Sequence, residues 1–184
     1  MGLLTIIRNQ KRKDKEIRML VLGLDNSGKT TIVKNMFQED VDGISPTMGF
    51  QIQSLSYRDY TINMWDIGGQ TSLRAFWSNY FDKTDVVLWV IDGVSVERVQ
   101  ESYQELHDKI IEQDRLVGVY LVIAINKIDL VAKSELKQLK DKVSKLLSLE
   151  EVIPERDHWN IELVSGKTGD GIEQVLQWVI TREY

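Results

Sequence analysis

Eight consecutive residues, Gly23 to Thr30, have the types and the spacing that bind phosphate groups. They read G-x-x-x-x-G-K-T and lie between an apolar run and a stretch with helical spacing. Glycines allow a tight loop whose N–H groups point inward, and the helix that follows adds free N–H groups and the positive end of its dipole. In such a loop Lys29 can reach the β- and γ-phosphates of a nucleotide, and the Thr30 hydroxyl can ligate Mg²⁺. The stretch therefore predicts a phosphate-binding loop.

A second group of polar residues follows the predicted strand at 60–65. Asp66 can hold Mg²⁺, usually through water, opposite the Thr30 hydroxyl. A glycine at position 69 lets its backbone N–H approach the γ-phosphate closely. Gln70 can orient a water for in-line attack, because phosphoryl transfer depends mostly on positioning and electrostatics. Thr47, in a polar loop earlier in the chain, can complete the Mg²⁺ ligand set and respond to the γ-phosphate.

A third motif, Asn126-Lys127-Ile128-Asp129, follows another apolar strand and fits the recognition of guanine. The Asp129 carboxylate can accept both N1–H and the exocyclic amino group of guanine, which adenine does not offer. Asn126 can tie this segment to the phosphate loop, and the Lys127 stem can cover the face of the base. Ser165-Gly166-Lys167 would bring a backbone N–H to the guanine O6. The predicted nucleotide contacts also include Gly23, Asp25, Asn26, Ser27, Gly28, Thr31 and Gly69.

Alternating apolar segments position these motifs. Strands are predicted at 17–22, 50–57, 60–65, 86–91, 119–125 and 161–164, with helices ending near 37 and spanning 96–110, 136–146 and 172–179. This order predicts an α/β fold, a doubly wound and mostly parallel six-stranded sheet with one antiparallel edge strand from the 50–65 hairpin. Ligands of such sheets bind beyond the carboxyl ends of the strands, where every motif named above lies.

Composition and charge narrow the class of protein further. The 184 residues suit one domain, and the absence of cysteine excludes disulfides and thiolate metal sites and fits a reducing cytosol. Residues 1–20 carry an excess of four positive charges, so that the net charge of −5 leaves −9 on the remainder. The acidic body argues against nucleic-acid binding. The basic start could touch an anionic membrane or an acidic partner, or could be a solvated helix face.

The first residues predict a short amphipathic helix, within 1–16, ahead of a domain at 17–184. Its apolar face would hold Leu3, Leu4, Ile6 and Ile7. Gly2 suggests N-myristoylation, but the motif requires Ser or Thr at position 6 and this chain has Ile6, so we expect no acylation. Four apolar side chains make a weak membrane anchor, and they could equally pack in a groove of the protein itself. We expect no cleavable secretory signal.

Taken together, G-L-D-N-S-G-K-T, P-T-M-G-F, W-D-I-G-G-Q, N-K-I-D and S-G-K resemble, in this order, a small GTPase of the Ras superfamily. The Asp25-Asn26 pair, Trp65 before the aspartate and the double glycine resemble the Arf family more narrowly. The opening Met1–Ile6 resembles Arf-like members more than trafficking Arfs. The branch it resembles most is linked to tubulin-folding cofactors and microtubule integrity.

The resemblance implies a monomeric, cytoplasmic switch with a link to microtubules, which binds GTP or GDP with Mg²⁺ and hydrolyses GTP slowly. It implies effector proteins, an exchange factor and an activating protein as partners, with weak or no membrane binding. Phe50, Trp65 and Tyr80 match the family's apolar effector triad. The 50–65 hairpin would slide in register between the two nucleotide states, and the N-terminal helix would leave its groove in the GTP state.

Other interpretations remain open at this point. The chain could be a GTP-binding scaffold whose hydrolysis is negligible without a partner. It could be an Arf-like GTPase of membrane trafficking or of lipidated-cargo release. A P-loop ATPase or nucleoside kinase is a third class, against which Asp129 and the absence of an arginine-rich insert argue.

Overall fold

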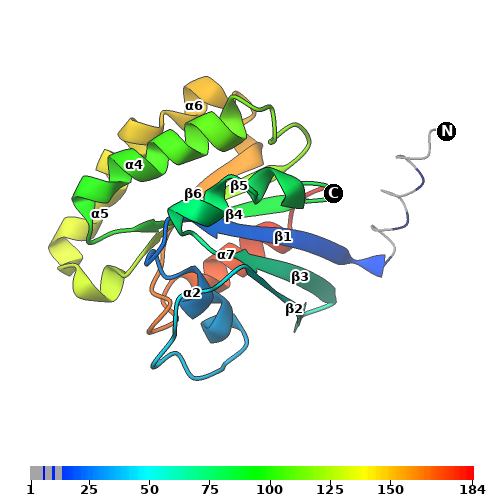
Figure 1. Cartoon of the computed structure of the whole chain (residues 1–184), viewed down its shortest axis with the longest axis horizontal. Helices are drawn as coiled ribbons and strands as arrows, with labels where there is room; N and C mark the ends of the chain where they lie inside the picture. Colours follow the sequence, from blue (N-terminus) through cyan, green and yellow to red (C-terminus); the bar gives the residue numbers. More distant parts are fainter. Residues whose placement is uncertain (1–5, 7–9, 11–13) are drawn as a thin grey trace.

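Six strands form one mixed sheet in the computed structural model, which describes residues 6, 10 and 14–184 (Figure 1). The strand order is β2-β3-β1-β4-β5-β6, and only the β2–β3 pair is antiparallel. The strands are β1 (Glu16–Gly23), β2 (Phe50–Tyr57), β3 (Tyr60–Ile67), β4 (Val86–Asp92), β5 (Tyr120–Asn126) and β6 (Trp159–Leu163). The predicted doubly wound sheet with an antiparallel edge strand is confirmed.

Helices cover both faces of the sheet. They are α2 (Lys29–Met36), α3 (Thr71–Arg74), α4 (Val96–Leu106), α5 (Leu136–Leu147), α6 (Leu149–Val152) and α7 (Ile172–Ile180). A π-helical turn, His107–Ile111, continues α4, where the sequence predicts an uninterrupted helix to 110. Short 3₁₀ helices span Trp77–Tyr80, Ile128–Leu130, Lys133–Glu135 and Arg156–His158.

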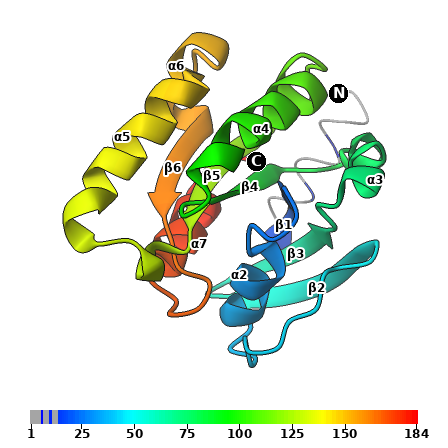
Figure 2. The same ribbon diagram turned by 60° about the vertical axis from the view of Figure 1, so that its left-hand side comes forward.

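Two hydrophobic cores lie on opposite faces of the sheet because successive side chains of a strand point to opposite sides. In β4, Val87, Trp89 and Ile91 face α4, α5 and α6, while Val86, Leu88 and Val90 face α2 and α7. Figures 1 and 2 show this three-layer arrangement, with β2 at one edge of the sheet and β6 at the other. Strands buried on both faces explain the continuous apolar runs of the sequence.

The predicted N-terminal helix lies almost entirely outside the described residues. Within its range the structure describes Ile6, which is exposed, and a hydrogen bond from the Gln10 amide to the Asp14 carboxylate. The division into a segment 1–16 and a domain 17–184 therefore stays a prediction, with β1 beginning at Glu16. Within the described part of the chain, no helix is long and apolar enough to cross a membrane.

The contrast between central and edge strands gives a stability prediction. Ile123 on β5 is fully buried, whereas Ile52 on the edge strand β2 is 47% exposed. We expect Ile123→Ala to lower the free energy of unfolding by about 2–5 kcal/mol because it opens a cavity in a close-packed core. Ile52→Ala, the matched control, should cost less than about 1 kcal/mol. Urea titration of both variants measures the difference, and equal losses would contradict this account of the core.

Candidate functional site

The loop between β1 and α2 curls around the ammonium group of Lys29. Lys29 is buried, and its Nζ donates hydrogen bonds to the carbonyl oxygens of Gly23 (3.0 Å) and Leu24 (2.7 Å). Burial lowers the pKa of Lys29 to about 8 because the charged form loses its hydration. Gly28 precedes α2 with φ +92°, and a Cβ there would lie 2.2 Å from the Asn126 Nδ2. The loop therefore requires glycine at this position, as the sequence motif predicts.

Three oxygen-bearing side chains from different segments meet beside this loop. The Thr30 hydroxyl donates to the Asp66 Oδ2 at 2.5 Å and lies 2.7 Å from the Thr47 hydroxyl. Asp66 is 2% exposed, and burial raises the pKa of its carboxyl group. Its Oδ1 is buried and has no hydrogen-bond partner among the described residues. A buried carboxylate oxygen without a partner, next to two hydroxyls, is a donor set that fits a hard cation such as Mg²⁺.

The segment after β3, residues 68–70, packs against the phosphate loop. The Asp25 N–H donates to the Gly69 carbonyl oxygen at 3.1 Å, and the Gly68 N–H donates to the Gly49 carbonyl at 2.8 Å. A Cβ on Gly69 would lie 2.4 Å from the Gly23 carbonyl oxygen, so only glycine allows this approach. Gln70 is half-buried and makes one weak contact, from Nε2 to the Met48 Sδ at 3.7 Å. Its amide is therefore available to hold a water.

A cavity of about 330 Å³ joins these groups, a volume in the range of small-ligand sites. Its walls come from the phosphate loop, the 44–47 loop and the segment after β3. The lining residues are Asp25, Asn26, Gly28, Lys29, Thr30, Thr31, Ile44, Ser45, Pro46, Thr47, Gly68, Gly69 and Gln70. Predicted site residues from the phosphate loop, the 44–47 loop and the segment after β3 thus face one cavity, whereas Asp66 and the predicted residues at 126–129 and 165–167 do not line it.

Hydrogen bonds connect the predicted base-recognition segment, residues 126–129, to the phosphate loop. The Asn126 Nδ2 donates to the Ser27 carbonyl at 2.9 Å, and the Gly166 N–H donates to the Asn126 Oδ1 at 2.9 Å. The Lys127 Nζ contacts the Asn26 carbonyl at 2.7 Å.

The Asp129 carboxylate is exposed on this segment, where a hydrogen bond from the Ser165 hydroxyl (2.7 Å) orients it. Lys167 is also exposed. Asn126 therefore ties its segment to the phosphate loop, as predicted, and its contact with Gly166 joins the 165–167 loop as well.

Three aromatic rings gather on the surface beside the site. The ring centroids of Phe50, Trp65 and Tyr80 lie 5.6–6.2 Å apart, and the Arg18 guanidinium stacks on Trp65 at 4.0 Å. Phe50 is half-exposed, while Trp65 and Tyr80 are partly buried. Met48, Ile52 and Phe76 add further exposed apolar surface. Trp65 and Tyr80 also pack against the core of the α4 face, so the three rings form a partly buried apolar cluster whose most exposed member is Phe50.

Sequence reasoning missed a set of charged residues that support the site. Arg74 and Arg98 both donate to the carboxylate of Asp25, at 3.1 and 2.9 Å. Lys127 also forms an ion pair with Asp92 at 2.7 Å. These partners are far apart in the chain and belong to no spaced motif. Their charges alone gave no signal of the pairing.

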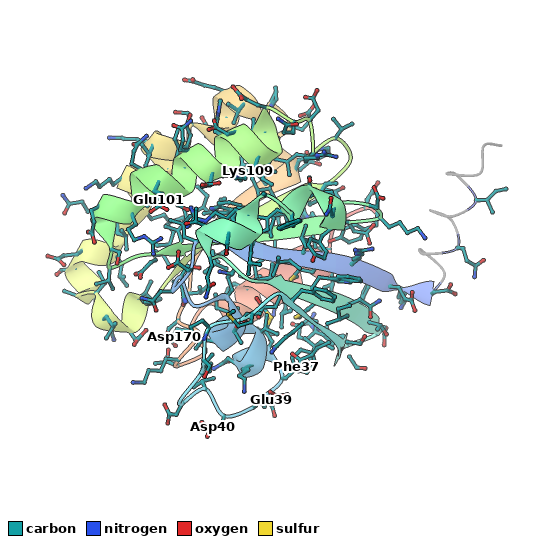
Figure 3. All side chains as sticks on the ribbon, viewed as in Figure 1. Phe37, Glu39, Asp40, Glu101, Lys109 and Asp170 are labelled. Atoms are coloured by element: carbon teal, nitrogen blue, oxygen red, sulfur yellow. The ribbon has the colours of Figure 1, made fainter. Side chains whose placement is uncertain are left out.

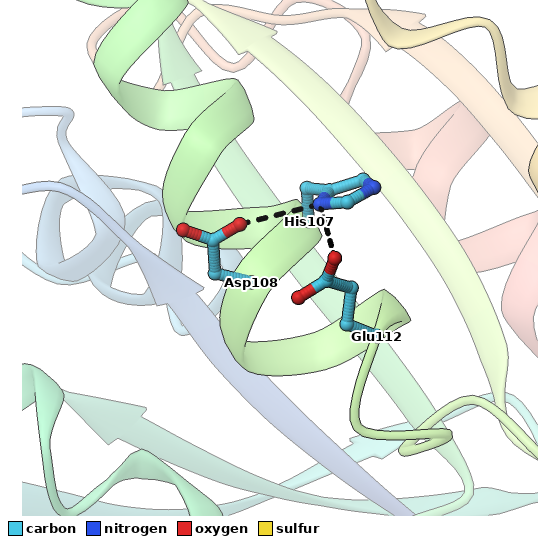
Figure 4. Close-up of side chains that lie close together, drawn as sticks. All are labelled: His107, Asp108 and Glu112. Carbon is cyan, nitrogen blue, oxygen red and sulfur yellow. Dashed lines mark hydrogen bonds and ion pairs between the residues drawn. The ribbon is translucent and has the colours of Figure 1, made fainter.

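A separate cluster of possible metal ligands lies on the π-helical turn (Figure 4). The His107 Nδ1 is 3.2 Å from Asp108 and 3.7 Å from Glu112. In an α-helix, residues five apart differ in direction by roughly 140°, so the π turn brings His107 and Glu112 to one face. The three side chains are partly or fully exposed, and hydrogen bonding and ion pairing account for their arrangement.

The sheet order and the loop that ends its first strand define the class of protein: this is the P-loop GTPase fold. A profile of the ADP-ribosylation factor family matches residues 3–183, and the chain belongs to this family of small GTPases. The family resemblance of the sequence motifs is confirmed.

Individual relatives agree with this assignment. The chain is 43% identical over 180 residues to ADP-ribosylation factor-like protein 2 of Dictyostelium discoideum, covering 98% of this chain and 94% of the relative. ADP-ribosylation factor-like protein 3 of Chlamydomonas reinhardtii is 42% identical over 181 residues, covering 98% of each chain.

A solved structure is similar in fold. It is the Arl6 BBS3 small GTPase of Trypanosoma brucei with the bound nucleotide analogue GppNp. Its TM-score is 0.73 at 23% identity, over 92% of this chain and 99% of the other. This likeness bears on the fold alone.

The buried lysine gives a prediction for the nucleotide-free protein. The pKa of Lys29 is about 8 in the folded chain and near 10.4 in an unfolded one. Between these values the unfolded chain binds more protons, so stability rises with pH. We expect the difference in unfolding free energy between wild type and Lys29→Met to grow in favour of wild type, by about 1–3 kcal/mol, from pH 8 to pH 10. Denaturant titrations at several pH values measure it, and a pH-independent difference would contradict the buried ammonium.

Proposed function

We propose that the chain is a guanine-nucleotide switch that binds GTP or GDP with Mg²⁺ and slowly hydrolyses GTP to GDP and phosphate. The observation that carries this proposal is the meeting of Thr30, Thr47 and the unpartnered Asp66 Oδ1 beside the phosphate loop. A buried oxygen in this position is costly unless a ligand satisfies it. Membership of the ADP-ribosylation factor family supports the same function.

Each group of the site has a role in this proposal. Lys29 and the inward N–H groups of the loop bind the β- and γ-phosphates. Thr30, Thr47 and, through water, Asp66 would hold Mg²⁺, which would supply positive charge beside the phosphates. Gln70 orients the attacking water. The loops that carry Thr47 and Gly69 would be held by the terminal phosphate and Mg²⁺ together, so that their positions would depend on whether this phosphate is present.

No arginine lines the cavity among the described residues, and the 38–49 loop contains none. Intrinsic hydrolysis is therefore slow in this proposal. An activating protein that supplies an arginine would accelerate it by on the order of 10³–10⁵-fold. An exchange factor would release GDP, and effectors would bind the cluster of Phe50, Trp65 and Tyr80 in the GTP state.

For the cellular role we propose a cytoplasmic regulator of tubulin folding or microtubules, acting with a tubulin-folding cofactor. Its support is the likeness to relatives named ADP-ribosylation factor-like protein 2, from Dictyostelium discoideum, Arabidopsis thaliana and Drosophila melanogaster, at 41–43% identity. A role in trafficking or in release of lipidated cargo is the alternative. Mass spectrometry of the N-terminus separates the two, because acylation of Gly2 favours membrane trafficking.

The first test is the nucleotide that accompanies the purified protein. We expect close to one guanine nucleotide per chain after denaturation and ion-exchange chromatography. Asp129→Asn should lower guanine-nucleotide affinity roughly 100-fold or more and favour xanthine nucleotides, because an amide can donate to the xanthine O2. Asp170→Asn, which changes an exposed carboxylate on a nearby loop, is the matched control. Adenine nucleotide in the preparation would overturn the proposal in favour of an ATPase.

The role of Gln70 is tested by single-turnover hydrolysis. We expect Gln70→Leu to bind GTP as wild type does and to hydrolyse it at least about tenfold more slowly, because the leucine cannot orient water. Gln138→Leu, on the exposed face of α5, is the control and should hydrolyse at the wild-type rate. An unchanged rate in Gln70→Leu would exclude Gln70 from the reaction.

A further inference from the structure

Arg74, at the end of the short helix that follows Gln70, is the most heavily engaged cation in the described chain. It is 3% exposed. Its Nε–H donates to the Gly69 carbonyl at 2.9 Å, and one Nη donates to Glu101 at 2.9 Å and Glu105 at 3.0 Å. The other Nη donates to Asp25 at 3.1 Å. One side chain thus joins the segment after β3, the phosphate loop and α4.

The Gly69 carbonyl oxygen, which accepts a hydrogen bond from Arg74, has a second donor. The Gly69 carbonyl also accepts a hydrogen bond from the Asp25 N–H, at 3.1 Å. Two donors from different directions fix the plane of this peptide, which also carries the Gln70 N–H. The neighbouring Gly69 N–H has no protein acceptor within residues 14–184. The peptide group before Gln70 is therefore fixed against the phosphate loop, next to an N–H that is free to bind a ligand.

The far end of Arg74 is anchored by α4, on which Glu101 is labelled in Figure 3. Arg98, one helical turn before Glu101, donates to the Glu101 Oε2 (3.2 Å) and to both the carbonyl (2.9 Å) and the carboxylate (2.9 Å) of Asp25. Hydrogen bonding from Arg98 lowers the pKa of Asp25. Two guanidinium groups and three carboxylates therefore form one connected cluster between α4 and the phosphate loop.

This geometry separates Arg74 from a direct part in hydrolysis. Its guanidinium does not line the cavity, and its polar atoms are committed to the Gly69 carbonyl and to carboxylates. Removing it would leave the Gly69 carbonyl with one donor and the two α4 glutamates without their shared cation. We therefore expect the Gly69–Gln70 peptide to lose its fixed orientation first.

We propose that Arg74 is a positioning residue that holds the Gly69–Gln70 peptide in the GTP-binding conformation by tying it to Glu101 and Glu105 of α4. In the proposed function the Gly69 N–H faces the terminal phosphate, which GDP lacks, so this tie would favour GTP over GDP. The inference rests on the proposed nucleotide function. It assigns to α4, which does not line the cavity, a direct influence on nucleotide preference.

The test measures affinities for GDP and for a non-hydrolysable GTP analogue by competition with a fluorescent guanine nucleotide. We expect Arg74→Gln to lower the GTP-analogue affinity about tenfold relative to that for GDP. The Glu101→Gln/Glu105→Gln variant should lower the ratio in the same direction, because Arg74 loses its anchor. Arg74→Lys should recover part of the ratio, since one ammonium cannot reach the Gly69 carbonyl and both glutamates at once.

Glu97→Gln, which changes an exposed carboxylate on the same helix, is the matched control and should keep the wild-type ratio. A purely structural role would lower both affinities in parallel and leave the ratio unchanged, which overturns the proposal. If Arg74→Gln does not fold, the glutamate variant and Arg74→Lys decide the question. Failure of the underlying nucleotide function is distinct, because the wild-type protein itself would then bind neither guanine nucleotide.

Discussion

The parallel pairing of β1 with β3 is the constraint on which the site depends. Its register sets Val21 opposite Asp66, so the carboxylate emerges beside the loop that begins two residues later at Gly23. On the far side of β4, the pairing of Asp92 with Asn126 brings the predicted base-recognition segment to the same edge. A shift of one residue in either register would turn a site residue to the opposite face of the sheet. The cavity is thus a product of strand alignment more than of loop sequence.

The site contains two buried charged groups whose desolvation cost a bound ligand would lower. The Lys29 ammonium is removed from water with only carbonyl oxygens as partners, and Asp66 is buried with one oxygen unpartnered. Both groups are costly in this environment. Because these costs fall when phosphate and a cation are bound, the folded protein is expected to gain stability from its nucleotide. Binding and folding are therefore linked through two side chains.

The positions of the principal site residues could be predicted because each follows a strand and belongs to a spaced motif. Asp66, Asn126 and the phosphate loop were placed this way, and the fold followed from the alternation of apolar segments. Details set by tertiary contacts could not be predicted. The β3 strand extends through Ile67, two residues further than predicted, because β2 pairs with it to that point. The Arg74 cluster was missed because its partners lie 27 to 49 residues away.

The two-residue turn at Arg58 and Asp59 joins β2 and β3, whose other ends lead into two loops that line the cavity. These strands are paired along their whole length and so form one continuous unit. On β3, Ile62 and Met64 are buried on one face. A slide along β1 by one residue would expose both, whereas a slide by two returns each position to its own face. The register of the hairpin against β1 therefore permits displacement without a change of face only in steps of two residues, so that any movement of this element along β1 would be stepwise and not gradual.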